Sequence, residues 1–346
     1  MKTMTTSDTN TSPNIKLSVL DLVPVTQGNT HQQSFYNSLD LAKHVEKLGF
    51  ERFWISEHHN MDSIVSSATV VLLGFLAQGT STIRIGSGGI MLPNHAPLIV
   101  AEQFGTLATL YPDRIDLGLG RAPGTDQLTA QALRMGRQES VQDFPNNIAE
   151  LQQYFSADNE DSRVRAIPGE GLDVPIYLLG SSTFSAQLAG EKGLPYAFAS
   201  HFAPAHLFNA LNLYRETFKP SAQLQKPYAM ACVNVIAAET DEEAQRLATS
   251  LYQFAMGIIT GIRMPLQPPI ESMDGVWNEA QEAMIKNMMY YTFIGSQETI
   301  ERELSEFVEN TGVQEIIAVS HIFDHNARKK SYEILANAMK NVGELA

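Results

Sequence analysis

The sequence predicts an α/β fold, a (β/α)8 barrel of the TIM type with an insertion near residues 257–290. Short β-branched runs alternate with amphipathic helical stretches from residue 15 almost to the end, a pattern typical of βαβ units with parallel strands. Eight strands can be counted, which favours a closed barrel over an open doubly wound sheet, although the count alone leaves the open sheet as an alternative. With 44% apolar residues, the 346-residue chain can bury a core of the required size.

The predicted strands are short runs rich in aliphatic and aromatic residues. In chain order they span residues 15–22, 52–56, 83–86, 115–119, 176–179, 196–200, 228–236 and 315–319. Predicted helices fall between them, at residues 34–47, 98–110, 140–154, 182–192, 205–218, 241–256, 297–310 and 326–342. Two of these helices end with a lysine in the last turn and then a glycine, Gly49 and Gly193, which is typical of a left-handed C-cap.

Three stretches do not follow the alternation. Residues 1–14 are polar and are predicted to form a flexible N-terminal tail before a single barrel domain at residues 15–346, and residues 156–174 are predicted to be a surface excursion. The insertion at 257–290 holds five of the 13 methionines. Thioether side chains suit a surface that adapts to an apolar ligand, but they can equally pack the insertion onto the barrel or onto a second subunit.

The composition excludes several classes of protein. The formal net charge is −14 and no window concentrates cations, so neither nucleic acid nor an anionic membrane surface is an expected partner. The single cysteine, Cys232, excludes a disulfide framework and cysteine-ligated metal clusters, and it fits a reducing compartment. No signal peptide and no run of about 18 apolar residues is present. The sequence therefore predicts a cytoplasmic protein.

Polar residues directly after the second predicted strand are candidates for catalysis, because barrel enzymes carry their reactive groups at the carboxyl ends of strands. Residues 56–60 read SEHHN. Successive side chains of a strand point to opposite sides, so His58 and His59 are not expected to face one site, which weakens a metal-site interpretation. One histidine of the pair is predicted to be functional; the alternative is a histidine that only pairs with Glu57.

Glycine-rich runs follow two further strands, at residues 86–93 (GSGGIMLP) and 118–124 (GLGRAPG). Glycine lets the backbone approach a planar ligand closely, although either run can simply be a tight turn. Neither run is a dinucleotide-binding fingerprint, because Met91 and Pro123 replace the third glycine. Arg121 ends its strand in a chain with few cations, which indicates an anionic or flavin-like ligand; an ion pair with Asp126 is the alternative.

The fifth predicted strand leads into a glycine–hydroxyl turn that begins a helix, residues 180–186 (GSSTFSA). Gly180, Ser181, Ser182 and Ser185, together with the free amides of a helix N-terminus, form a pattern that can bind phosphate. Serines are also ordinary helix caps. The convergence of this turn with a strand-end arginine and a strand-end histidine favours the ligand site.

Taken in order, these motifs resemble the bacterial luciferase-like flavin monooxygenase family, especially its single-subunit members. The resemblance extends from Lys16 to about Met339. It is carried by residues 48–54 (LGFERFW), 57–59 (EHH), 86–93 (GSGGIMLP), 111–121 (YPDRIDLGLGR) and 180–182 (GSS).

The resemblance implies a barrel that binds reduced FMN, or in some branches a deazaflavin, at the carboxyl ends of its strands. His58 matches a catalytic histidine that assists proton movements, and Arg121 matches a position that contacts the flavin. The turn matching Ser182 and Ser185 holds the flavin phosphate. The Gly88–Gly89 bond matches a non-prolyl cis peptide beneath the flavin ring. Light emission is not implied, because Gly120 stands where light-emitting members have a reactive cysteine.

Membership would make the protein a monooxygenase that uses reduced FMN and O2 on a small, mainly apolar organic substrate. A separate NAD(P)H-dependent flavin reductase would supply the reduced cofactor, the Met-rich insertion would act as a lid, and a homodimer is expected because relatives commonly form one. Three rivals stay open: a deazaflavin-dependent dehydrogenase of the same fold, a metal-dependent barrel hydrolase using Glu57 and His58, and a flavin-binding protein without turnover.

Overall fold

The structure, a computed structural model, describes residues 15–133, 141–262 and 264–340. The predicted N-terminal tail, residues 1–14, lies outside these described residues, as do the first residue of the helix predicted at 140–154 and the last two of the helix predicted at 326–342.

Eight parallel strands close into a barrel, which confirms the predicted (β/α)8 fold. They are β1 (Lys16–Asp21), β2 (Arg52–Ile55), β3 (Arg84–Ser87), β5 (Ile115–Gly120), β6 (Ile176–Gly180), β7 (Tyr196–Phe198), β8 (Ala229–Ala237) and β10 (Glu315–Val319). Each strand pairs with the next one in this order, and β10 pairs with both β8 and β1. Glu315 lies opposite Met230 on one side and Lys16 on the other, and this double pairing closes the sheet.

Two short strands were not predicted. β4 (Ile90–Met91) pairs with the carboxyl end of β5, and β9 (Thr292–Gly295) pairs with the second half of β8. The nine residues of β8 serve both neighbours, because residues 230–234 pair with β10 and residues 234–237 pair with β9. Neither short strand is long enough to show a periodicity of its own, since β4 has two residues and β9 has four.

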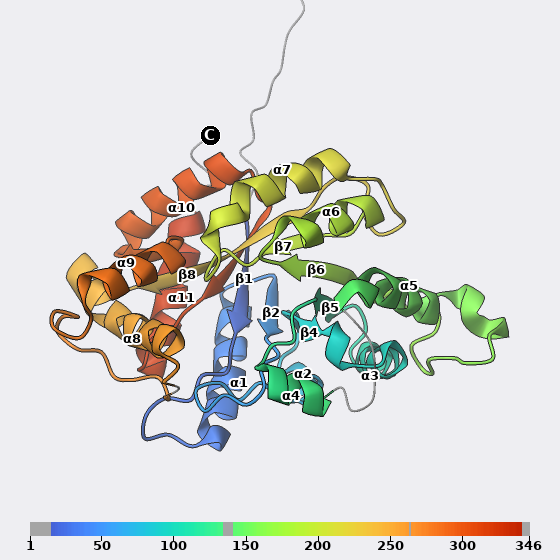
Figure 1. Cartoon of the computed structure of the whole chain (residues 1–346), viewed down its shortest axis with the longest axis horizontal. Helices are drawn as coiled ribbons and strands as arrows, with labels where there is room; N and C mark the ends of the chain where they lie inside the picture. Colours follow the sequence, from blue (N-terminus) through green and yellow to red (C-terminus); the bar gives the residue numbers. More distant parts are fainter. Residues whose placement is uncertain (1–14, 134–140, 263, 341–346) are drawn as a thin grey trace, which may run out of the picture.

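The helices form an outer ring around the strands, with α8 and α9 at one side of the view in Figure 1 and α5 at the other. Those that match predictions are α1 (His31–Lys47), α3 (Pro97–Leu110), α5 (Phe144–Phe155), α6 (Thr183–Lys192), α7 (Leu207–Thr217), α8 (Asp241–Thr260), α10 (Gln297–Thr311) and α11 (His325–Lys340). Short 3-10 turns span Leu92–Asn94, Val141–Asp143, Ala157–Asp161 and Pro204–His206. The predicted glycine stops are confirmed, since Gly49 and Gly193 both have positive φ.

Three helices were not predicted: α2 (Thr69–Gly79), α4 (Gln127–Leu133) and α9 (Glu279–Met288). The sequence of α2, TVVLLGFLAQG, is apolar on nearly every side and so gives no helical periodicity. The helix α9 starts with a capping box in which Asn278 and Gln281 bond each other's backbone, but its position inside a Pro-rich insertion concealed that signal.

The core has two layers because strand side chains alternate between the two faces of the barrel wall. Phe53 and Ile55 of β2 point outward and pack against the helices in the larger hydrophobic cluster. Trp54, between them, points into the barrel and packs with Leu20 and Cys232 in a smaller interior cluster. All three β2 side chains are fully buried.

At the amino ends of the strands the barrel is filled by an ion-pair network rather than by apolar side chains. Arg52 donates from Nε to Glu315 (2.7 Å) and from Nη1 to Asp116 (2.7 Å). Arg84 also binds Asp116, and Tyr228 donates to Glu315 at 2.6 Å. Two guanidinium groups therefore face two carboxylates, which balances the buried charge.

The insertion follows α8, which continues to Thr260, four residues beyond its predicted end. Its first part runs beside the loop after β1, where Leu266 donates to the Val25 carbonyl (2.7 Å) and accepts from the Gln27 amide (2.9 Å). Met273 and Met289 of this region are buried, whereas Met264 and Met284 are about half exposed. The insertion is thus partly packed onto the barrel and partly a free apolar surface. No described helix has the length and apolar character needed to cross a bilayer.

Candidate functional site

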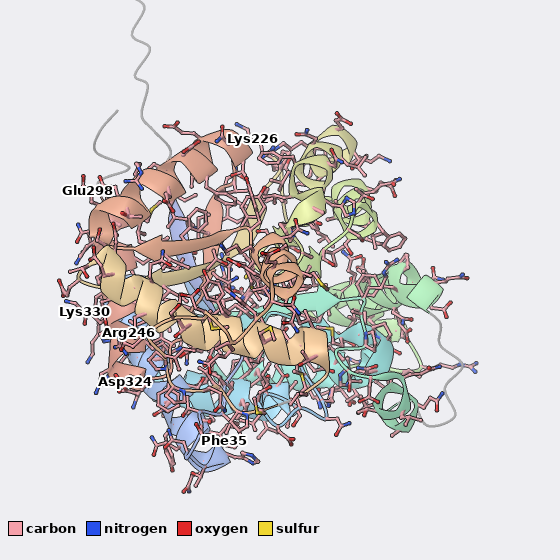
Figure 2. The ribbon with its side chains drawn as sticks, turned by 60° about the vertical axis from the view of Figure 1, so that its left-hand side comes forward. Phe35, Lys226, Arg246, Glu298, Asp324 and Lys330 are labelled. Carbon is pink, nitrogen blue, oxygen red and sulfur yellow. The ribbon has the colours of Figure 1, made fainter. Side chains whose placement is uncertain are left out.

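The predicted site residues all lie at the carboxyl ends of neighbouring strands. His58 follows β2, Gly88 and Gly89 follow β3, Arg121 follows β5, and residues 180–185 end β6 and begin α6. Because β2, β3, β5 and β6 are consecutive in the sheet, these residues occupy one arc of the barrel mouth. Two residues labelled in Figure 2 mark the ends of the barrel. Lys226 lies just before β8, at the amino end of the strands, and Phe35 lies near the start of α1, at the carboxyl end.

His58 is held by a short chain of hydroxyl groups. Its Nδ1 lies 3.0 Å from Ser56 Oγ, which in turn lies 3.0 Å from Ser66 Oγ, and both serines are buried. Burial lowers the pKa of His58 to about 4, against the opposing effect of the Glu57 carboxylate. The imidazole is therefore neutral at neutral pH, with Nδ1 engaged and Nε2 as the nitrogen that can serve a reacting group.

The Glu57 carboxylate accepts hydrogen bonds from several groups in the loops around it. Its Oε1 accepts from His59 Nε2 and from His95 Nε2, both at 2.9 Å, and its Oε2 accepts from the Met91 amide at 3.0 Å. Burial alone would raise the pKa of Glu57, but these hydrogen bonds outweigh it and lower the pKa to about 2. The carboxylate thereby ties the loops after β2 and β3 together.

The two adjacent histidines therefore have different partners, although β2 ends at Ile55 and strand alternation does not extend to them. His59 pairs with Glu57, and His58 pairs with Ser56 instead. Within the described residues, no group of three or more His, Cys, Asp or Glu side chains has the geometry to hold a metal ion. The arrangement gives the metal-dependent hydrolase no support.

The paired glycines lie where no side chain fits. The Gly88–Gly89 peptide is cis. A Cβ at Gly88 would lie 2.7 Å from Leu20 Cδ1, and one at Gly89 would lie 2.7 Å from the carbonyl oxygen of Gly118. Ser87 bridges the same region, because its hydroxyl donates to the Gly118 carbonyl (2.8 Å) and accepts from the Gly118 amide (3.1 Å). The space that a side chain would need at either position is therefore occupied by neighbouring atoms of the chain, which explains the two glycines.

Packing against Met91 explains why position 120 is a glycine. A Cβ there would lie 2.9 Å from Met91 Sδ, so the thioether already occupies the space that a side chain at position 120 would need.

Arg121 reaches across to the beginning of α6. Its guanidinium carbon lies 4.1 Å from the centroid of the Phe184 ring, a cation–π contact. The alternative partner, Asp126, instead binds Asn60 and caps α4 through Thr129. This cation therefore lies beside the predicted phosphate turn, and no carboxylate of the described residues forms an ion pair with it.

The N-terminus of α6 has its amides available. Ser182 is the N-cap residue, yet its side chain makes no capping hydrogen bond, and Ser181 and Ser182 are partly exposed. Ser185 differs, because it is only 2% exposed and its hydroxyl lies 2.7 Å from where a Cβ of Gly180 would stand. This close approach explains the glycine at position 180, and the Ser185 N–H is one of the amides of the first turn that have no partner within the helix.

Two histidines at the mouth were not among the predicted site residues. His201 follows β7 and His321 follows β10, and Nδ1 of His201 and both ring nitrogens of His321 are buried. The criterion that singled out His58, a polar side chain directly after a strand, applies to both.

A cavity of about 800 Å³ lies at the opposite, amino end of the barrel and is lined in part by Arg52, Tyr177 and Tyr228. These side chains are committed to the ion-pair network and its hydrogen bonds, so we assign the cavity no chemistry. A smaller cavity of about 240 Å³ lies at the mouth, between the loop after β2 and the insertion.

Comparison with known proteins matches residues 15–315 to a family model described as luciferase-like monooxygenase. YvbT of Bacillus subtilis (strain 168) is 55% identical over 94% of this chain and 97% of its own. A luciferase-like monooxygenase of Escherichia coli (strain K12) is 48% identical over 94% of this chain and 97% of its own. An N-acetyl-S-alkylcysteine monooxygenase of B. subtilis (strain 168) is 31% identical over 94% of this chain and 98% of its own.

Among solved structures, apo-MsnO8 has 34% identity and a TM-score of 0.84, covering 94% of this chain and 98% of that one. The oxygenating constituent of 3,6-diketocamphane monooxygenase of Pseudomonas putida, in complex with FMN, has 18% identity and a TM-score of 0.71 over 95% and 98% of the two chains. An F420-dependent secondary alcohol dehydrogenase has 15% identity and a TM-score of 0.69 over 94% and 99%. The last two likenesses show the fold alone.

Proposed function

Because this chain belongs to the luciferase-like monooxygenase family, we propose that it is a flavin-dependent monooxygenase that uses reduced FMN and O2 to oxygenate a small, mainly apolar organic substrate. The observation that carries the proposal is the position of Arg121, whose guanidinium lies over the Phe184 ring at the start of α6, where the N-cap side chain makes no capping hydrogen bond. Reduced FMN, when bound, supplies the electrons that activate O2.

The residues present fit this cofactor. The free amides at the start of α6, with the hydroxyls of Ser181 and Ser182, would hold the phosphate, and Ser185 would contribute its amide. Arg121 would lie beside the flavin, and the Gly88–Gly89 backbone would lie under its ring. The neutral imidazole of His58 would accept or donate a proton at Nε2, while the Ser56 and Ser66 hydroxyls hold its orientation.

We also propose that a separate NAD(P)H-dependent flavin reductase in the cytoplasm supplies the reduced cofactor, since neither glycine run carries a dinucleotide-binding fingerprint. A homodimer is proposed too. Its support is the apolar outer face of α2 and α3, where Val71 is 72%, Phe75 37% and Ile99 46% exposed.

The proposal is tested by O2 consumption with a flavin reductase, NADH and FMN, in the presence of a panel of aldehydes, ketones and sulfur compounds. Sulfur compounds belong in the panel because one 31%-identical relative is an N-acetyl-S-alkylcysteine monooxygenase. Substrate-dependent O2 uptake with an oxygenated product is the expected result.

Parallel titrations with FMN and with F420 show which of the two cofactors the protein binds. Tight binding of F420 without FMN binding would indicate the deazaflavin-dependent dehydrogenase, and FMN binding without any substrate-dependent O2 uptake would indicate a protein that binds flavin without turnover.

A further inference from the structure

A second set of polar groups lies at the barrel mouth, outside the arc described above. Neither ring nitrogen of His321 has a hydrogen-bond partner within the described residues, and the same holds for Nδ1 of His201. These atoms are buried, and a buried polar group without a partner costs about 1–3 kcal/mol. A bound water or ligand is therefore expected to supply the hydrogen bonds that the described residues do not.

His201 faces His58 across the mouth, whereas His321 follows β10, which only β1 separates from β2. Three strands separate β2 from β7 on either side of the barrel, so β7, which His201 follows, stands opposite β2. Burial, with smaller contributions from the nearby His321 and His58, lowers the pKa of His201 to about 3. Side chains from opposite sides of a barrel come close enough to shift each other's pKa only near the barrel axis. A substrate must lie at this axis to reach His58.

The imidazole of His321 is uncharged at neutral pH. Burial lowers the pKa of His321 to about 4, and its two charged neighbours, Arg328 and Asp21, form an ion pair with each other at 2.7 Å. A neutral imidazole has one N–H and one lone pair in either tautomer. His321 therefore presents one unpaired donor and one unpaired acceptor, whichever nitrogen carries the proton.

An apolar compartment adjoins His321. The Phe254 ring stacks on the His321 ring with centroids 4.9 Å apart and an angle of 26°. The same Phe254 lines the cavity of about 240 Å³, which is also lined by Met61, Ile258, Ile262, Met264 and Pro265. Met61 and Phe254 both pack against the hydrophobic cluster inside the barrel. These two side chains thus form the wall between the cavity and the histidines.

We propose that His321 and His201 bind the hydrogen-bonding group of the substrate, and that the cavity beside Phe254 receives its apolar part. The substrate is then a small uncharged molecule that carries a strong hydrogen-bond acceptor, such as a ketone or amide oxygen, on an apolar body. An alkane or a thioether leaves the imidazole N–H unpaired and binds less well, because buried donors discriminate against ligands that cannot pair with them. The cavity is smaller than the roughly 300–1,000 Å³ of sites for drug-sized ligands, which favours a short apolar chain. This inference extends the proposed function.

The test measures binding of 2-octanone and of its sulfur analogue, hexyl methyl sulfide, by ligand-observed NMR, with and without oxidised FMN. We expect the wild-type protein to bind the ketone at least tenfold more tightly than the thioether. His321→Phe keeps a ring that can stack on Phe254 and removes both nitrogens, so it is expected to weaken ketone binding at least tenfold and to leave thioether binding unchanged. His321→Asn, which restores a donor and an acceptor, should recover part of the loss.

Thermal unfolding of the same variants distinguishes this role from a structural one. Removing an unpaired buried polar group is expected to leave the melting temperature of His321→Phe unchanged or higher. Equal ketone affinity in wild type and His321→Phe, or no discrimination between ketone and thioether, would overturn the proposal. If His321→Phe does not fold, His201→Phe and Phe254→Ala carry the same test.

Phe254→Ala removes the wall and should shift the preferred 2-alkanone to a longer chain, and an unchanged preference would count against the cavity. Ketone binding does not depend on the FMN titrations, so a failure of the flavin assignment and a failure of this one give different results.

Discussion

The Arg121 guanidinium lies 4.1 Å from the centroid of the Phe184 ring, although the two residues belong to loops that follow different strands, β5 and β6. Arg121 directly follows β5, and Phe184 lies in the first turn of α6. The contact holds a positive charge beside the free amides of a helix N-terminus, in a chain whose net charge is −14.

Arg121→Ala should weaken FMN binding by more than tenfold, about 1.4 kcal/mol or more, because the charge beside the flavin is lost. Quenching of flavin fluorescence measures the affinity. Arg302→Ala, which removes a 63%-exposed arginine side chain on α10, is the control for the change in net charge and should leave the affinity unchanged. An Arg121→Ala protein with wild-type affinity would remove this residue from the flavin site.

His58→Ala should suppress product formation by about 10²–10⁴-fold while FMN affinity changes little, because the imidazole moves protons and does not anchor the cofactor. Product is measured by chromatography after incubation with reductase, NADH and a substrate from the panel. Ser66→Ala, which removes the outer hydroxyl of the chain that orients His58, should give a smaller loss. Full turnover in the His58 variant would reject its role.

Glu57 should make stability depend on pH below about 4.5. Its pKa is lowered from 4.5 to about 2 on folding, so its contribution, about 3 kcal/mol, is complete above the unfolded-state value. That contribution is lost as the pH falls from 4.5 toward 2. Urea unfolding at a series of pH values measures it. Glu57→Gln should be less stable at pH 7 and show a flatter acid limb; an identical pH profile in the two proteins would contradict the assignment.

Glu315→Gln should destabilise the fold by about 3–5 kcal/mol, because it leaves Arg52 partly unpaired in the barrel interior. Lys16→Ala is the matched control. It breaks the exposed pair with Glu51, which lies at the same end of the barrel, and should cost less than about 1 kcal/mol. Chemical denaturation compares the two. Equal effects would mean that the interior network adds no more than a surface ion pair.

Val71→Asp should weaken self-association if α2 and α3 form the proposed dimer interface, because it places a charge in the apolar face. Sedimentation equilibrium at micromolar concentration measures the change. Leu128→Asp, at a 78%-exposed position on α4, is the control and should leave the association unchanged. A wild-type protein that is monomeric at these concentrations would refute the dimer.

Much of the fold could be predicted because its signals are local. The eight barrel strands are β-branched runs between helical stretches, and glycines such as Gly49 and Gly193 stop helices by adopting positive φ. The helix α2 escaped prediction because its exposed face is as apolar as its buried face, and periodicity needs a contrast between the two.

The sequence by itself determined which residues stand at the strand ends, because barrel topology follows from the order of elements: His58, Arg121 and the turn at 180–185 were placed at the mouth from their neighbours along the chain. Only the tertiary structure decided what each one touches. It paired Arg121 with Phe184 rather than Asp126, buried the Ser185 hydroxyl under Gly180, and brought His201 and His321 together without partners. These outcomes depend on contacts between loops of different strands, and no local pattern encodes the distance between side chains so far apart along the chain.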